Sequence, residues 1–143
     1  MEKWESNIVV NRPVEDVFAF VINPENGPLW HIGSGEIQPI SEEPIGVGKR
    51  HRIIKQIFVW RLETVTEVTE YELNQKVSFK SISGPYPFEL RYTFERVNSG
   101  TRLTEFGEAK LPGFLKLAVR LTIGTAKKNS EAGLSKLKRY LEA

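Results

Sequence analysis

The sequence of 143 residues contains no cysteine, which excludes disulfide bonds, thiolate metal ligands and cysteine nucleophiles. Its two histidines, His31 and His51, lack the close spacing of a zinc site. No apolar run approaches the roughly 18 residues that cross a membrane, and the first ten residues lack the apolar stretch of a signal peptide. We therefore expect a cytoplasmic protein with no metal and no cofactor.

Composition and charge are those of an ordinary globular protein, with 40% hydrophobic and 27% charged residues. The length suits one domain, which we place at residues 1–143. Residues 110–143 carry eight Lys or Arg and two Glu, whereas the residues before them are net acidic. A basic segment can meet nucleic acid or an anionic membrane. We favour the interpretation that this segment forms the solvated face of a helix, because no aromatic residue interleaves with the lysines from 127 to 138. We therefore expect no nucleic-acid partner.

The first thirty residues predict one strand followed by two short helices. Residues 3–10 read as a strand, and Asn11 is suited to cap a helix with Pro13 in its first turn. The apolar residues that follow recur at helical spacing: Val14, Val17, Phe18 and Val21. The segment PENGPLW at 24–30 predicts a second short helix or a tight loop.

Period-two alternation dominates residues 36–110 and predicts six strands, each with one buried and one wet face. Turn signals separate the strands except near residues 57–59, where the boundary is least defined. From Leu111 onward the pattern becomes helical to the end of the chain. About thirty helical residues would span about 45 Å, enough to cross a sheet. Gly124 and Gly133 lie inside that stretch and favour a bend.

Several local strings resemble those of a known superfamily: NRPVEDVFAFVINPENGPLWH at 11–31, IGVGKRHR at 45–52, VTEVTEYELNQKVSF at 65–79, GTRLTEFGE at 100–108 and LSKLKRYLEA at 134–143. Their order is similar to that of the START-like superfamily, which includes pollen-allergen-like proteins, polyketide cyclase/dehydrases and lipid-transport domains. The resemblance implies an α+β helix-grip fold. In it, a curved seven-stranded antiparallel sheet wraps a long C-terminal helix, two short helices join the first and second strands, and an apolar cavity lies between sheet and helix. It implies no single chemistry.

The alternation also predicts which side chains face that cavity. Even positions in 60–68 and 88–94 share the apolar parity, as do His51, Ile53 and Lys55 on the preceding strand. Leu103 sets the inward parity of the last strand and brings Glu105 with it. The predicted ligand-binding residues are Trp30, His51, Ile53, Trp60, Leu62, Thr64, Thr66, Phe79, Phe88, Leu90, Tyr92, Glu105, Phe114, Ala118 and Leu121.

Three of these residues are candidates for chemistry. A carboxylate on an apolar wall suits proton transfer, so Glu105 with His51 or Tyr92 is the candidate acid–base pair. The structural alternative is that Glu105 pairs with His51 or Lys55, or reaches water near the cavity mouth. His51 and Tyr92 can equally orient a ligand or satisfy a backbone group.

Three functions follow from these observations. The leading hypothesis is a non-catalytic protein that binds or transports a small hydrophobic or amphipathic ligand such as a lipid, isoprenoid, quinone or polyketide. The alternatives are a cyclase/dehydrase-type enzyme that uses the acid–base candidates and a co-chaperone-like interaction module.

A second apolar stripe, formed by Phe114, Ala118, Leu121 and Thr125, is displaced from the main stripe of the C-terminal helix. It predicts a cavity gate or a contact surface, for a second protomer or a membrane, or else packing under the short helices. Transient membrane contact, and a monomer or a homodimer, both stay open.

Overall fold

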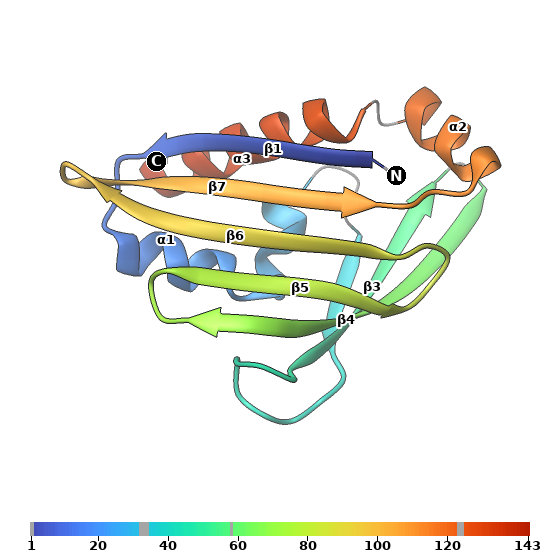
Figure 1. Ribbon diagram of the computed structural model, residues 1–143, viewed down its shortest axis with the longest axis horizontal. Coiled ribbons are helices and arrows are strands. Elements are labelled where there is room, and N and C mark those ends of the chain that lie inside the picture. Colours follow the sequence, from blue (N-terminus) through green and yellow to red (C-terminus); the bar gives the residue numbers. More distant parts are fainter. Residues whose placement is uncertain (1, 32–34, 58, 123–124) are drawn as a thin grey trace.

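The computed structural model describes residues 2–31, 35–57, 59–122 and 125–143, without the side chains of residues 57 and 118–122. The chain runs through strand β1, two short helices, six further strands and two C-terminal helices (Figure 1). The strands are β1 (Glu2–Val10), β2 (Glu36–Pro39), β3 (Arg50–Ile57), β4 (Trp60–Glu72), β5 (Lys76–Ser83), β6 (Phe88–Val97) and β7 (Gly100–Ala109). The helices are α1 (Val14–Val21), the 3-10 helix η1 (Pro24–Leu29), α2 (Gly113–Thr122) and α3 (Ala126–Glu142).

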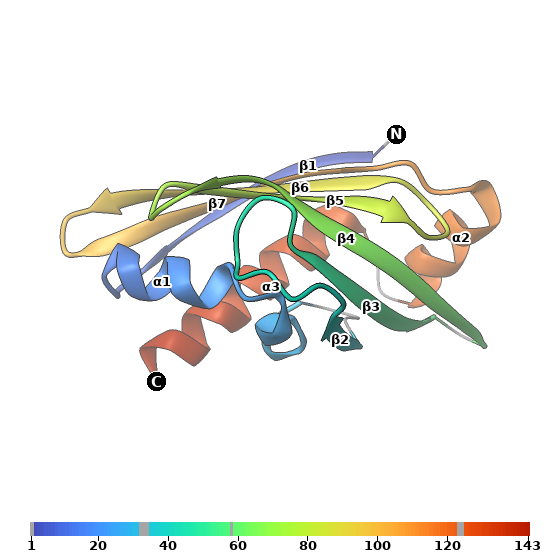
Figure 2. The same ribbon diagram turned by 90° about the horizontal axis from the view of Figure 1, so that it is seen from below.

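The seven strands form one antiparallel sheet in the order β1-β7-β6-β5-β4-β3-β2. Strands β2 to β7 are a meander, and β1 joins its far side by pairing with β7. The sheet curves so that α1, η1 and α3 all lie on its concave side, as seen in Figure 2. This arrangement confirms the expected α+β helix-grip fold.

The predicted alternation holds where the sheet faces α3. Thr64, Thr66 and Val68 of β4 are buried, as are Tyr92 and Phe94 of β6. A shift of register follows Val68 in the pairing with β5 and ends the simple alternation there. The inward face of the sheet is therefore set by residue parity, as the sequence indicates.

The core fills the space between the sheet and one end of the helical layer. Val17 of α1 and Leu137 of α3 are completely buried, and Leu134 is 1% exposed. Phe18 packs edge-to-face on Phe94, with the ring centroids 5.0 Å apart. These contacts anchor the C-terminal half of α3 beside α1.

The expected single C-terminal helix is instead two helices. Helix α2 ends at Thr122, and Thr125 starts α3 by accepting a hydrogen bond from the Lys128 amide at 3.3 Å. Gly124, expected at a bend, lies outside the described residues. Gly133 produces no break in α3. Its missing side chain makes room for Trp30, because a Cβ there would lie 3.0 Å from the Trp30 carbonyl oxygen.

The expected cap of the first helix is also different. Pro13, not Asn11, precedes α1, and no side chain caps that helix. The backbone N–H of Asn11 donates instead to the Glu142 carboxylate at 2.6 Å. This bond lowers the pKa of Glu142 and ties the start of α1 to the end of α3.

Two lysines of the basic segment bind the free edge of the sheet. Lys138 donates to the carbonyl of Val9 at 2.7 Å, and Lys127 donates to the carbonyl of Glu5. Both acceptors belong to β1, which is the edge strand next to β7. Lysines at this position bind backbone carbonyl groups of an edge strand, which could otherwise pair with a strand of another chain. Part of the basic charge therefore serves the fold.

We expect Leu137→Ala to lower the free energy of unfolding by about 2–5 kcal/mol, because it removes a fully buried side chain and leaves a cavity. Lys136→Ala, on the exposed side of the same helix, is the matched control and should change stability by less than about 0.5 kcal/mol. Urea denaturation measures both. Equal effects would show that the docking of α3 contributes little to stability.

Candidate functional site

Two adjoining cavities lie between the sheet and the helical layer. The larger, about 170 Å³, is bordered by β1, β3, β6, β7 and the first turns of α3. The smaller, about 100 Å³, lies between the sheet and η1. Five residues line both cavities: Trp30, His31, Lys55, Phe88 and Leu90. The interior is therefore one divided space, with Trp30 and His31 among the groups between its two parts.

A hydrogen bond between β1 and β7 shapes the larger cavity. Trp4 pairs with Gly107, and its indole Nε1 donates to Glu105 Oε1 at 2.9 Å. The indole lies over the glycine, since a Cβ on Gly107 would come within 2.2 Å of the ring. The carboxylate of Glu105, 4% exposed, is thus held against an apolar wall by a neutral donor.

Two basic groups accompany this carboxylate at the cavity. Lys55 of β3 lines both cavities, and so does His31, whose ring stacks on Trp30 with centroids 3.8 Å apart. Burial lowers the pKa of His31 to about 4, although the negative charge of Glu105 acts in the opposite direction. His31 is therefore neutral near pH 7, and Lys55 supplies the positive charge of the site.

Two buried hydroxyl groups at the cavities have no hydrogen-bond partner among the described residues: Ser130 Oγ at the larger cavity and Tyr92 Oη at the smaller. Tyr92 is the cross-strand neighbour of Glu105. Burial raises the pKa of Tyr92 well above its ordinary value, and the charge of Glu105 raises it further. Tyr92 is therefore a neutral hydrogen-bonding group. Unpartnered buried hydroxyls cost free energy that a polar ligand group can recover.

The structure places eight of the predicted ligand-binding residues at these cavities. Trp30, Phe88 and Leu90 line both, and Glu105 lines the larger. The smaller cavity takes Ile53, Thr66, Phe79 and Tyr92.

The other predicted residues lie elsewhere or are not described. His51 is buried but lines neither cavity, so Glu105 is not brought together with His51 as one candidate pair required. Leu62 packs against Leu115, and Thr64 contacts Gly84. Trp60 and Phe114 are 39% and 68% exposed. The side chains of Ala118 and Leu121 lie outside the described residues.

Several residues complete the larger cavity without being predicted to line it, among them Trp4, Tyr86, Asn129 and Gly133. The strand alternation could have identified Trp4, because Trp4 and Val10 lie on the same face of the first strand and Val10 is fully buried. Lys55, which the strand parity predicts on the inward face, and Ser130 of α3 both line the larger cavity.

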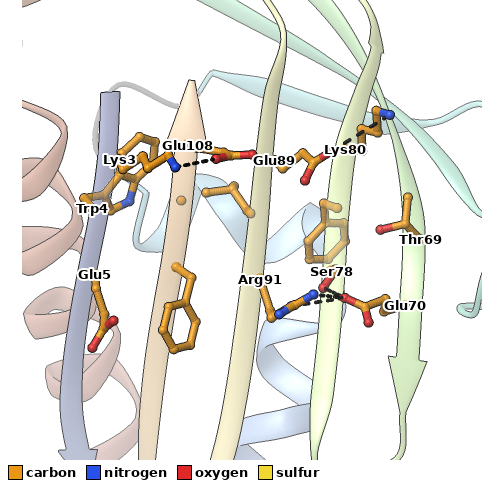
Figure 3. Close-up of a pocket in the computed structure, with 14 residues that line it drawn as sticks. Lys3, Trp4, Glu5, Thr69, Glu70, Ser78, Lys80, Glu89, Arg91 and Glu108 are labelled. Atoms are coloured by element: carbon orange, nitrogen blue, oxygen red, sulfur yellow. Dashed lines mark hydrogen bonds and ion pairs between the residues drawn. The ribbon is translucent and has the colours of Figure 1, made fainter. Parts of the chain in front are cut away.

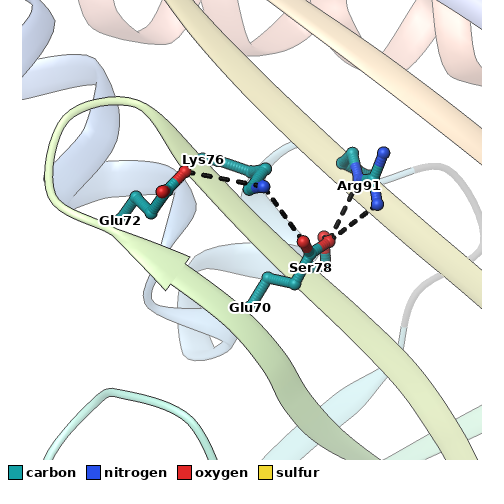
Figure 4. A network of polar contacts seen from close by, with 5 residues as sticks. All are labelled: Glu70, Glu72, Lys76, Ser78 and Arg91. Atoms are coloured by element: carbon teal, nitrogen blue, oxygen red, sulfur yellow. Dashed lines mark hydrogen bonds and ion pairs between the residues drawn. The ribbon is translucent and has the colours of Figure 1, made fainter.

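The opposite face of the sheet forms a shallow open groove of about 820 Å³, shown in Figure 3. Charged pairs cross it from strand to strand, such as Lys3 with Glu108 at 4.0 Å. Glu70 is the centre of the network in Figure 4, where it accepts from Ser78 at 2.7 Å and from Arg91. The Ser78 and Lys76 contacts lower the pKa of Glu70 to about 2. This face is a solvated ladder of ion pairs rather than a second site.

Within the described residues, no group of three or more His, Asp or Glu side chains could hold a metal ion. No described helix is long and apolar enough to cross a membrane.

Comparison with known proteins now identifies the family. Residues 1–142 match the family described as "Polyketide cyclase / dehydrase and lipid transport". The chain belongs to this family. Its architecture is accordingly that of the START-like superfamily, as the sequence strings indicate. A search of the curated proteins found no match.

Solved structures share this family's fold at low sequence identity. A Thermus thermophilus protein, TTHA0849, is 18% identical, with a TM-score of 0.77 and coverage of 99% of this chain and 97% of its own. The Zhui aromatase/cyclase from Streptomyces sp. R1128 is 10% identical, with a TM-score of 0.71 and coverage of 99% and 93%. A START superfamily protein from Mycobacterium smegmatis is 18% identical, with a TM-score of 0.68 and coverage of 98% and 94%.

We expect the protein to lose stability as the pH falls from about 6.5 towards 4, before most carboxylates titrate. His31 has a pKa of about 4 in the folded state and an ordinary value near 6.5. The unfolded chain therefore binds a proton at a higher pH than the folded protein does. This difference lowers the free energy of unfolding by on the order of 3 kcal/mol by pH 4.

His31→Gln should remove most of this loss in urea denaturation. The pKa of His51 is also lowered by burial, so His51→Gln should remove a further part of the acid loss, and the double variant should have the flattest profile between pH 6.5 and 4. A wild-type pH profile that His31→Gln leaves unchanged would contradict the lowered pKa of His31.

Proposed function

We propose that the protein binds and carries a small ring-shaped apolar molecule with one or two polar groups. The observation that carries the proposal is the divided cavity, whose walls combine Trp4, Trp30, Phe88 and Leu90 with the carboxylate of Glu105. Family membership supports a ligand-binding role, since the family covers polyketide chemistry and lipid transport.

The size of the space limits the ligand. An apolar cavity of about 150 Å³ holds a benzene molecule, so the larger cavity of about 170 Å³ suits one ring. A second small ring or a short chain can extend into the neighbouring 100 Å³. Pockets for drug-sized molecules are typically about 300–1,000 Å³. A two-chain lipid is therefore too large for the cavities as they stand.

The polar groups of the walls limit the ligand further. Glu105 can accept a hydrogen bond, whereas Lys55 can donate one, and both line the larger cavity. Because the two charges offset each other, a neutral molecule with a hydroxyl and a carbonyl or ether oxygen suits the site better than an ion. Ser130 Oγ and Tyr92 Oη, unpartnered among the described residues, offer further contacts.

A cyclase/dehydrase-type enzyme is the second candidate, and one observation favours it. Glu105 and Tyr92 are directly opposite on β7 and β6, so a carboxylate that lines the larger cavity is the strand neighbour of a neutral phenol that lines the smaller one. Such a pair can act as base and acid on a bound ketone. Glu105→Gln would lower the rate of such an enzyme by about 10²–10⁴-fold, but would leave a carrier's affinity for a neutral ligand nearly unchanged.

The test measures binding of 2-naphthol by thermal shift and calorimetry, with oleate for comparison. We expect 2-naphthol at a hundred times its Kd to stabilise the protein by about 2.7 kcal/mol. Ala126→Trp, which fills the larger cavity from the first turn of α3, should weaken binding at least about tenfold.

Ala132→Trp is the matched control on the exposed face of α3 and should bind normally. Oleate binding more tightly than 2-naphthol would contradict the size limit. Equal binding by Ala126→Trp and the wild type would place the ligand elsewhere.

A further inference from the structure

Four exposed apolar side chains gather at the end of the molecule where α2 meets the β3–β4 hairpin. Val59 and Trp60 of the hairpin are 86% and 39% exposed, and Phe114 and Leu117 of α2 are 68% and 60% exposed. The rings of Trp60 and Phe114 meet edge-to-face, 6.0 Å between centroids. We call these four residues the apolar tip. Figure 1 shows both of its elements at the same end of the sheet.

The segment that contains α2 is rich in basic residues. Residues 110–130 contain five Lys or Arg and no Asp or Glu, and α2 lies within that segment. Two acidic side chains approach from neighbouring strands, where Glu2 pairs with Lys116 at 3.9 Å and Glu63 pairs with Arg61 at 2.8 Å. Lys110 and Lys128 are exposed and add positive charge without an acidic neighbour in sequence.

We propose that the apolar tip docks on an anionic membrane surface. A helix with Phe and Leu on one side and Lys or Arg beside them is suited to lie in the headgroup region. Each basic residue near an anionic surface adds electrostatic attraction. Trp60 stands next to this helix, and tryptophan favours the interface between lipid and water.

A second copy of the chain suits the tip less well. Self-association through this end would bring two basic segments together, which is unfavourable. A stable interface also buries about 800 Å² on each partner, from about 20–30 residues, and four side chains fall far short of that.

The apolar tip lies close to one end of the larger cavity. The larger cavity is lined by Leu111, just before α2, and by Ala126, at the start of α3. A membrane-docked tip therefore holds this end of the cavity near the lipid, from which an apolar molecule can be collected. Docking itself does not depend on the ligand proposal, so the two can fail separately.

The experiment is co-sedimentation with vesicles of phosphatidylcholine alone and of phosphatidylcholine mixed with phosphatidylserine. The wild type should bind the anionic vesicles at least about tenfold more strongly than the neutral ones. Raising the salt from about 0.1 M to about 1 M shortens the screening length from about 10 Å to about 3 Å and should release most of the protein. Trp60 emission should shift to the blue on binding, a change that Trp60→Phe removes.

Phe114→Asp with Leu117→Asp should weaken vesicle binding at least about tenfold. Leu73→Asp is the matched control, because Leu73 is 67% exposed but lies in the β4–β5 turn at the other end of the sheet. Val59→Asp, at the most exposed of the four positions, gives a second variant should the double variant fail to melt cooperatively.

Four results would overturn the proposal. One is absence of wild-type binding to anionic vesicles, and another is equal binding to neutral and anionic vesicles. The third is a dimer in light scattering that the Phe114 and Leu117 changes dissociate, without any vesicle binding. An equal loss in Leu73→Asp would likewise show that the apolar tip is not the docking surface. Normal binding of 2-naphthol in any of these cases would leave the carrier proposal standing.

Discussion

The interior of this protein is arranged around the hydrogen bond from Trp4 to Glu105. A carboxylate on an apolar wall is costly unless a donor satisfies it. The 2.9 Å bond from the indole supplies that donor, and the absence of a side chain at Gly107 lets the indole reach it. The same ring forms part of the wall of the larger cavity. One contact therefore links side chains of the paired first and last strands, keeps an acidic group inside and shapes the space beside it.

The two ends of the helical layer serve different purposes. At one end, Leu134 and Leu137 of α3 pack with α1 into a closed core, and the Asn11–Glu142 bond ties the layer together. At the other end, the start of α3 borders the larger cavity, and α2 lies beyond it with Phe114 and Leu117 exposed. A closely packed half thus adjoins a half that contains the cavity and exposes Phe114 and Leu117.

The sequence patterns predict the features of the fold that depend on the alternation of side chains along a strand and on the order of the elements. Alternation alone puts Tyr92 and Glu105 on the inward face, and the succession of elements predicts the meander and the place of the first strand. Trp4 is different, because its role arises from pairing with Gly107, more than a hundred residues away. Parity likewise groups His51 with the cavity wall, but His51 lies between Pro39 of β2 and Thr66 of β4 and lines neither cavity. The division of the C-terminal helix is not visible in its apolar stripe, since both halves continue the same helical period.

The location of the ligand is the central claim, and the indole N–H signals of the three tryptophans test it most directly. Trp4 and Trp30 line the larger cavity, whereas Trp60 lies in the apolar tip. In ¹H–¹⁵N spectra recorded during titration with 2-naphthol, the signals of Trp4 and Trp30 should shift and saturate together, while that of Trp60 stays in place. Saturable binding that moves only the Trp60 signal, or none of the three, would contradict a site between the sheet and α3.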